Sequence, residues 1–213
     1  MSFVLPDPGA PNAEFERPAD PARLERVSLA LQARGLKAQV AASGAEARQI
    51  VLDGIPLGAE VHTALSQTVI DVGIASEIDE SGRYDSLRVK LAQLDRETQA
   101  REMRKLGAAP DYLVGSAHAI TDGGVVIVGS GSGSQLGAIA YAAGAVFLVV
   151  GHQKLVATLD EGLRRLREYS LPREYLRMQG AGYPGSLLAK TLVVEREPRG
   201  RITVILVAET LGF

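Results

Sequence analysis

The sequence predicts an α/β protein built on an open, mostly parallel sheet. Short β-branched runs alternate with amphipathic stretches along most of the 213-residue chain, which is the pattern of repeated strand–helix units. The run 145–150 is continuously apolar, as expected for a strand that is buried on both faces of a parallel sheet. We therefore place this strand at the centre of the sheet.

Capping residues and hydrophobic spacing predict the separate elements. Asp20 precedes Pro21 at the start of a helix that ends at Gly35, and Ser43 caps a second helix that ends near Gly54. Strands are predicted at 37–41, 59–62, 111–114, 125–128, 145–150, 192–195 and 202–208, and further helices at 66–72, 86–106 and 155–168. Residues 119–124 are interpreted as a turn, 170–190 as a long functional loop, and 197–200 as a hairpin or long turn.

The first eighteen residues differ in character from the rest. They contain four prolines and no periodic apolar pattern, so residues 1–18 are predicted to be a disordered or surface-draped arm that can be deleted without loss of the fold. Residues 19–213 are predicted to form a single domain with a sizeable core.

Composition excludes several classes of protein. The net charge of −2, with both signs interspersed, offers no basic surface for nucleic acid or membrane, and no apolar run reaches transmembrane length. A soluble cytoplasmic protein is expected. The chain has no cysteine, and His62, His118 and His152 lie far apart in sequence, so we expect neither a metal ion nor another cofactor on this chain.

A glycine- and serine-rich loop follows the strand at 125–128. Residues 129–135 read Gly-Ser-Gly-Ser-Gly-Ser-Gln and lead into an Ala-rich segment that is predicted to be helical. Glycines allow close backbone approach, and a helix N-terminus offers free N–H groups, so this strand–loop–helix pattern favours an anion such as phosphate or carboxylate. The spacing fits neither a P-loop nor a dinucleotide fingerprint. A tight connection with serine caps is the alternative.

Several ordered motifs together carry a resemblance to a known family. They are Gly115-Ser-Ala-His-Ala-Ile-Thr121, the loop from Ser130 to Gln135, Val150-Gly-His-Gln-Lys154, and the terminal Leu206-Val-Ala-Glu-Thr-Leu-Gly-Phe213. From about residue 23 to the end, the chain resembles the LUD-domain family of the lactate-utilisation protein C type. This family is similar to the NagB/RpiA/CoA-transferase-like superfamily. The resemblance implies a doubly wound, three-layer core with helices on both faces of the sheet.

The resemblance also implies a range of functions. Some relatives take part in iron–sulfur-dependent oxidation of L-lactate to pyruvate, and longer ones carry Cys-rich segments that this chain lacks. Our first hypothesis is a protein of lactate or organic-acid utilisation that binds a small carboxylate or phosphorylated metabolite. The second is a non-catalytic accessory subunit that docks on iron–sulfur partner subunits. Sugar-phosphate isomerase or CoA-transferase chemistry rests on fold analogy alone. A homo-oligomer is compatible with each of them.

The candidate ligand-binding residues gather in three stretches. They are Gly131, Ser132, Gly133, Ser134 and Gln135 of the loop, Gln153 and Lys154 after the central strand, and Lys190 in the long loop. Polar residues at the carboxyl end of a central strand are where open α/β sheets contact ligands. A cation at a helix start is unfavourable, so Lys154 is predicted to pair with an anionic ligand or an acidic side chain.

The candidates for acid–base or nucleophilic chemistry are His118, His152 and Glu209. A structural histidine explains His118 as well as a general base does, and a turn explains Asp122. Ser66, Gln67 and Thr68 either cap the helix that they begin or face the same cleft as the loop.

Overall fold

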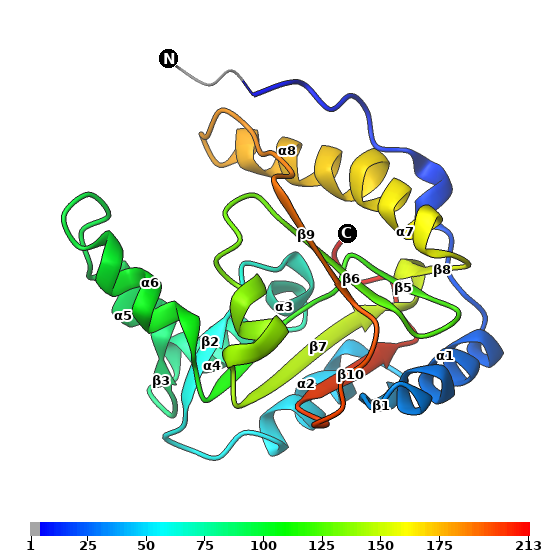
Figure 1. Cartoon of the computed structure of the whole chain (residues 1–213), viewed down its shortest axis with the longest axis horizontal. Coiled ribbons are helices and arrows are strands. Elements are labelled where there is room, and N and C mark those ends of the chain that lie inside the picture. Colours follow the sequence, from blue (N-terminus) through cyan, green and yellow to red (C-terminus); the bar gives the residue numbers. More distant parts are fainter. Residues whose placement is uncertain (1–4) are drawn as a thin grey trace.

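The structure, a computed structural model, describes residues 5–213 and has a six-stranded sheet at its centre (Figure 1). The strand order is β1 (Lys37–Ala41), β10 (Ile202–Val207), β7 (Ala145–Gly151), β4 (Tyr112–Gly115), β2 (Glu60–Thr63) and β3 (Asp85–Ser86). Every neighbouring pair is parallel. The predicted α/β class is therefore confirmed, and the apolar strand β7 lies inside the sheet.

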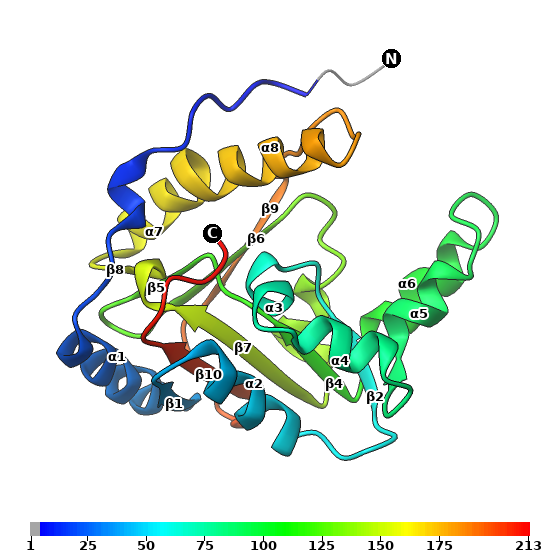
Figure 2. The ribbon, with the colours of Figure 1, turned by 180° about the vertical axis from the view of Figure 1, so that it is seen from behind.

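Helices cover one face of this sheet (Figure 2). They are α2 (Gly44–Asp53), α3 (Gln67–Asp71) and α4 (Ile74–Glu80). The side chains of β7 alternate, so Phe147 and Val149 point into the core beneath these helices while Val146 and Leu148 point into the core on the other side. A run that is apolar at every position thus serves two cores at once.

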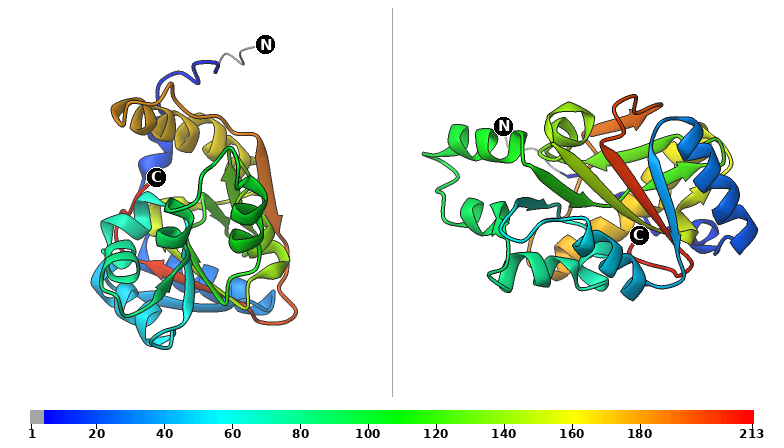
Figure 3. Two further views of the ribbon diagram at one scale, coloured as in Figure 1. Left: turned by 90° about the vertical axis from the view of Figure 1, so that its left-hand side faces the viewer. Right: turned by 90° about the horizontal axis from the view of Figure 1, so that it is seen from below.

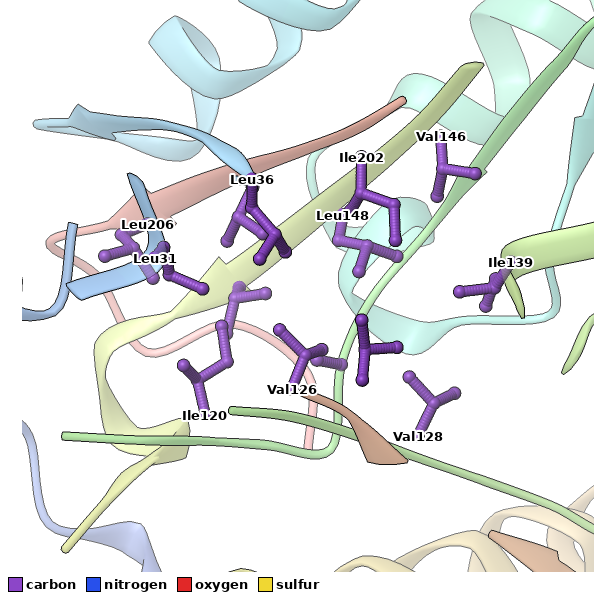
Figure 4. Close-up of a cluster of buried hydrophobic side chains, with 14 of the residues drawn as sticks. Leu31, Leu36, Ile120, Val126, Val128, Ile139, Val146, Leu148, Ile202 and Leu206 are labelled. Carbon is purple, nitrogen blue, oxygen red and sulfur yellow. The ribbon is translucent and has the colours of Figure 1, made fainter. Parts of the chain in front are cut away.

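A second sheet covers much of the other face, together with α1 (Pro21–Ala33) and the short helical segment η2 (Ala138–Ala142). Its strands are β8 (Leu155–Val156), β5 (Ala119–Thr121), β6 (Val126–Ser130) and β9 (Lys190–Val194), in that order. Val126 and Val128 of β6 meet Leu148 of β7 in the core between the sheets (Figure 4). The three-layer prediction did not include this second sheet.

The outer face of the second sheet is covered by helices. Ile127 of β6 packs away from the main sheet toward α7 (Leu159–Arg165), and the chain continues through η4 (Leu166–Ser170) into α8 (Leu171–Gly180). The side views in Figure 3 show the same stacking of helices, second sheet, main sheet and helices. The pocket described below lies within this stack.

Local signals in the sequence are confirmed where capping defines them. The Asp20 carboxylate accepts a hydrogen bond from the Arg23 N–H at 2.8 Å, and the Ser43 hydroxyl accepts one from the Glu46 N–H at 3.2 Å. Gly35 takes a φ of +85°, which is a left-handed conformation that follows the end of α1.

The prediction for residues 155–190 is wrong in two respects. Leu155 and Val156 form a strand, and the helix begins only after Thr158, whose hydroxyl accepts a hydrogen bond from the Glu161 N–H at 3.2 Å. About half of the predicted long loop is α8, with Pro172 in its first turn, where proline is compatible with a helix. Lys154 consequently lies in the one-turn segment η3 (His152–Lys154) rather than at a helix start.

Two other segments also differ from the prediction. The predicted helix at 86–106 is two helices, α5 (Leu87–Ala92) and α6 (Ala100–Ala108), which project from the body in Figure 1. The turn between them is fixed by Asp95, which accepts hydrogen bonds from the N–H groups of Glu97 and Thr98. Part of the predicted turn at 119–124 is strand β5. Residues 197–200, predicted as a hairpin or a long turn, form a turn between β9 of the second sheet and β10 of the main sheet, so the hairpin alternative is excluded.

The N-terminal arm contacts α7 and η4 through residues 12–16. The Asn12 N–H donates to the backbone oxygen of Glu168 at 2.8 Å, and the one-turn segment η1 (Ala13–Glu16) places the ring of Phe15, 5% exposed, under the guanidinium of Arg164. Residues 1–4 fall outside the described part. None of the helices among residues 5–213 has the length and hydropathy needed to span a bilayer.

Because Phe15 is buried, Phe15→Ala should lower the free energy of unfolding by about 2–3 kcal/mol, somewhat less than the usual cost of a central phenylalanine. Glu14→Ala, which changes an exposed neighbour, should have little effect. Denaturant unfolding of the two variants tests this. Equal stability of both would show that the arm contributes nothing to the fold and can be deleted as predicted from sequence.

Candidate ligand-binding site

A pocket of about 210 Å³ lies at the carboxyl edge of the main sheet. Three neighbouring strands lead into it, with residues 64–67 following β2, residues 116–118 following β4 and Lys154 following β7. This is the edge at which open α/β sheets bind ligands. The volume is below that of drug-sized ligand pockets, so the pocket suits a small metabolite.

The opposite wall comes from the second sheet and its helices. It consists of residues 129–132, 134 and 135, parts of η4 and α8, and residues 186–188 of the following loop. Hydroxyl groups are the commonest polar groups in the lining, contributed by Ser66, Ser116, Ser130, Ser132, Ser134, Ser170 and Ser186. The sequence allowed Ser66 either to cap its helix or to face the cleft. Ser66 makes no capping hydrogen bond and lines the pocket, so it faces the cleft.

Lys154 is buried in the floor of the pocket, with 1% of its surface exposed. Its Nζ donates hydrogen bonds to the Thr68 Oγ1 at 2.8 Å and to the Ser116 Oγ at 3.1 Å. It forms no salt bridge within residues 5–213. Burial lowers the pKa of Lys154 well below its ordinary 10.5, with a further contribution from the positive charge of Arg165, while Asp71 opposes the shift. Of the two partners that the sequence predicts for Lys154, an acidic side chain is therefore not bonded to it among residues 5–213.

Arg165 is a second buried cation, and sequence reasoning missed it. Its guanidinium donates to the backbone oxygen of His118 and to the Ser170 hydroxyl, and lies 4.9 Å from the ring centroid of Tyr169. The Nε and Nη2 atoms have no hydrogen-bond partner, and no carboxylate pairs with the group among the described residues. Burial lowers the pKa of Arg165 to about 10, so it stays charged at neutral pH. Arg165 is not part of the pocket lining itself but lies behind it.

His118 lies in the pocket wall beneath these two cations. Its Nδ1 accepts a hydrogen bond from the Gly129 N–H at 3.1 Å, which requires the tautomer that carries its proton on Nε2. Burial, together with the positive charges of Lys154 and Arg165, lowers the pKa of His118 to about 3. The imidazole is therefore neutral and can donate a hydrogen bond from Nε2. With Nδ1 already bonded, this residue is a poor general base.

The glycine- and serine-rich loop does line the pocket, although its backbone offers less than the sequence suggested. The N–H groups of Gly129, Gly133 and Ser134 already donate to His118, Ser130 and Ser132. The helical segment after the loop, η2, is short and irregular, so its dipole is weak. What the loop presents to a ligand is chiefly its serine hydroxyls.

Five candidates are absent from the pocket lining, namely Gly133 of the loop and four residues outside the loop. Gln153 donates from Nε2 to the backbone oxygens of Leu211 and Gly212, and Glu209 accepts from the Gly44 N–H at 2.8 Å, so neither is oriented by a ligand. His152 contacts the Thr210 hydroxyl. Lys190 is exposed, with its aliphatic stem over Gly133. The position of Glu209 gives no support to the carboxylate nucleophile of a CoA transferase.

The terminal Leu-Gly-Phe motif has a structural reason that the sequence did not reveal. Thr68 donates to the backbone oxygen of Leu211 at 3.2 Å, and Gly212, with a φ of +56°, passes so close that a β-carbon there would lie 2.4 Å from the Thr68 hydroxyl. This segment therefore fixes the hydroxyl that accepts from Lys154. Phe213 itself lines the pocket.

The fold is that of an α/β protein with a small pocket at the carboxyl edge of a parallel sheet. The family model of the LUD domain matches residues 24–207, and the chain belongs to the LUD domain family. A crystal structure of a DUF162 family protein from Deinococcus radiodurans is similar to the chain, with a TM-score of 0.53 and 16% identity, over 89% of this chain and 99% of that one. This similarity shows a shared fold. A search of curated proteins found no significant match.

The burial of Lys154 predicts a specific dependence of stability on pH. In the unfolded chain the lysine titrates near 10.4, whereas in the folded chain its pKa is lower. Between these two values the unfolded state binds more protons, so stability rises with pH across this range and is lowest below the folded pKa. Lys154→Met removes this term and should be more stable than the wild type at pH 7, with a smaller difference at pH 10.

Denaturant unfolding at both pH values measures this, with Lys105→Met on the exposed surface of α6 as the matched control. A loss of stability in Lys154→Met at pH 7 would contradict it, and would place Lys154 in a stabilising ion pair.

His118 should stay neutral over the whole range in which the protein is folded, because its pKa lies near 3. Nitrogen NMR of labelled imidazoles distinguishes the protonation states and the tautomers, and His118 should show protonated Nε2 and unprotonated Nδ1 from pH 5 to pH 8. A transition near 6.5, the ordinary value for histidine, would be incompatible with this environment.

Proposed function

We propose that the pocket binds a small anionic metabolite, either a carboxylate or a phosphorylated compound. The observation that carries this proposal is the pair Lys154, which lines the pocket, and Arg165, which does not line it but is close enough to lower the pKa of Lys154. Both are buried, and neither takes part in an ion pair within residues 5–213. A buried cation is costly without a counter-charge. An anionic ligand supplies that charge.

The rest of the lining agrees with an anion of small size. Glu174 is the one acidic side chain among the lining residues, and Arg177 already neutralises it through contacts of 2.7 Å. The serine hydroxyls and the Nε2–H of His118 are donors for carboxylate or phosphate oxygens. Entry of an anion favours the charged form of Lys154, so binding and protonation of this lysine are coupled.

Membership of the LUD domain family relates the chain to lactate utilisation at the level of the family. L-lactate and pyruvate are small carboxylates that suit a pocket of this volume, and they are the first ligands that we propose. Binding to an iron–sulfur partner and assembly into a homo-oligomer stay predictions from the resemblance. A location in the cytoplasm stays a prediction from the composition of the sequence.

The experiment is a binding titration of L-lactate, pyruvate and inorganic phosphate by calorimetry, with thermal shift as a second measurement. Lys154→Met should weaken the binding of any of these anions about 10- to 100-fold, since a hydrogen bond to a charged group contributes roughly 1.5–3 kcal/mol. Lys105→Met is the matched control, and its affinity should equal that of the wild type. Lys190→Met tests the remaining lysine near the loop.

Equal affinity in the wild type and Lys154→Met would remove the lysine from the site. If none of the three anions binds to the wild type at millimolar concentration, the choice of ligands is wrong. Binding of neutral analogues in preference to anions would overturn the proposal as a whole.

A further inference from the structure

The hydrogen bonds around Lys154 define which of its atoms are already engaged. Thr68 donates its hydroxyl proton to the Leu211 backbone oxygen at 3.2 Å, and Ser116 donates its own to the Ala117 backbone oxygen at 3.1 Å. Both hydroxyl oxygens must therefore accept from Lys154 Nζ, at 2.8 Å and 3.1 Å. Two N–H groups of the lysine are thus bonded to protein acceptors.

A neutral amine has two N–H groups and one lone pair, which matches this environment. An ammonium group has a third N–H, and the described residues supply neither a third acceptor nor a carboxylate within hydrogen-bond distance, although the charge of Asp71 acts on Lys154 from further away. Burial favours the same form, because it lowers the pKa of Lys154. The lone pair is left on the side of the nitrogen that neither hydroxyl occupies, and Lys154 lines the pocket.

We propose that Lys154 is a nucleophile that forms an imine with a small carbonyl compound bearing an anionic group, of which a 2-oxo acid is the simplest case. This inference rests on the proposed anion site and names the class of substrate for it. The anionic group would be held by the serine hydroxyls of the pocket, and the carbonyl carbon would lie at the lysine nitrogen. A neutral amine in a desolvated pocket is a good nucleophile, whereas an exposed ammonium is not.

The step balances without a further reagent. The nitrogen lone pair attacks the carbonyl carbon, the new C–N bond forms, and the π electrons move to the oxygen, which takes up a proton from the nitrogen. The carbinolamine then loses its oxygen as water and becomes an imine. One water molecule is released for each imine formed, and no oxidant or reductant is consumed.

His118 has a compatible role in this step. Its Nδ1 is engaged by the Gly129 N–H, so its Nε2–H is the group that can donate to the carbonyl oxygen as negative charge develops there. Because the pKa of His118 lies near 3, the ring is uncharged and adds no positive charge beside Lys154. His118 would act as a hydrogen-bond donor, and the transferred proton comes from the amine.

The test is reductive trapping of the full-length protein with pyruvate and sodium cyanoborohydride at pH 7, followed by intact mass measurement and peptide mapping. We expect a single adduct on Lys154 that forms at least tenfold faster than any adduct on the exposed Lys105 and Lys190. Because the pKa of Lys154 is lowered, its rate should rise less steeply from pH 7 to pH 9 than the rates at Lys105 and Lys190. For a fully solvated amine the reactive neutral fraction increases about tenfold per pH unit in this range.

Lys154→Met should lose the fast adduct, while Lys105→Met and Lys190→Met should keep it. Thermal melting of each variant without ligand checks that it is folded. A phosphorylated aldehyde, glyceraldehyde 3-phosphate, serves as a second probe and distinguishes a carboxylate-bearing from a phosphate-bearing substrate.

L-lactate separates failure of this inference from failure of the anion site, because it is a carboxylate without a carbonyl at the second carbon. If L-lactate or phosphate binds in a Lys154-dependent manner and neither carbonyl probe is trapped on Lys154, the nucleophile is overturned while the anion site stands. If the adducts spread over the exposed lysines at equal rates, the nucleophile is overturned as well. If neither anions nor carbonyl probes bind, the proposed function itself has failed.

Discussion

The main constraint on this structure is that two basic side chains, Lys154 and Arg165, are buried without carboxylate partners among residues 5–213. Such an arrangement opposes folding, so the layers around it must hold it in place. The two sheets share one apolar core, and the helices α7 and α8 close the outer side. At the sheet edge, Gly212 approaches Thr68 closely and so fixes a hydrogen-bond acceptor for the lysine. The burial of these groups lowers the stability of the fold beside the pocket, where an anionic ligand can offset the loss.

Much of the fold could be predicted from the sequence, because its central signals are local. Ser43 and Asp20 cap the helices that their side chains predict, and the continuous apolar run of β7 indicates burial on two faces. The second sheet was missed because β5 and β8 are only three and two residues long, too short for a periodic signal. Leu155 fits a helical spacing as well as a strand, and only pairing with Ile120 decides between them.

The candidate site was predicted in part. Lys154 was identified for an incorrect reason, since no helix begins there, whereas its position after the central strand was the valid signal. Arg165 was missed within a charged segment. Its spacing of three from the buried Gly162 and four from Tyr169 was the available sign of a position on the inner face. Gln153 was assigned to a ligand and Glu209 to nucleophilic chemistry. Sequence cannot tell that Gln153 bonds to the backbone of Leu211 and Gly212, or that Glu209 accepts from the Gly44 N–H.

The most direct test of the central claim is a measurement of protons taken up when an anion binds. The empty pocket holds Lys154 with a lowered pKa, and an anion raises it again, so binding draws protons from solution. Calorimetry of L-lactate binding in buffers with different ionisation enthalpies gives this number. Our account predicts a net uptake of at most about one proton per site at pH 8, lost in Lys154→Met. Binding of lactate with no proton uptake in the wild type would contradict it.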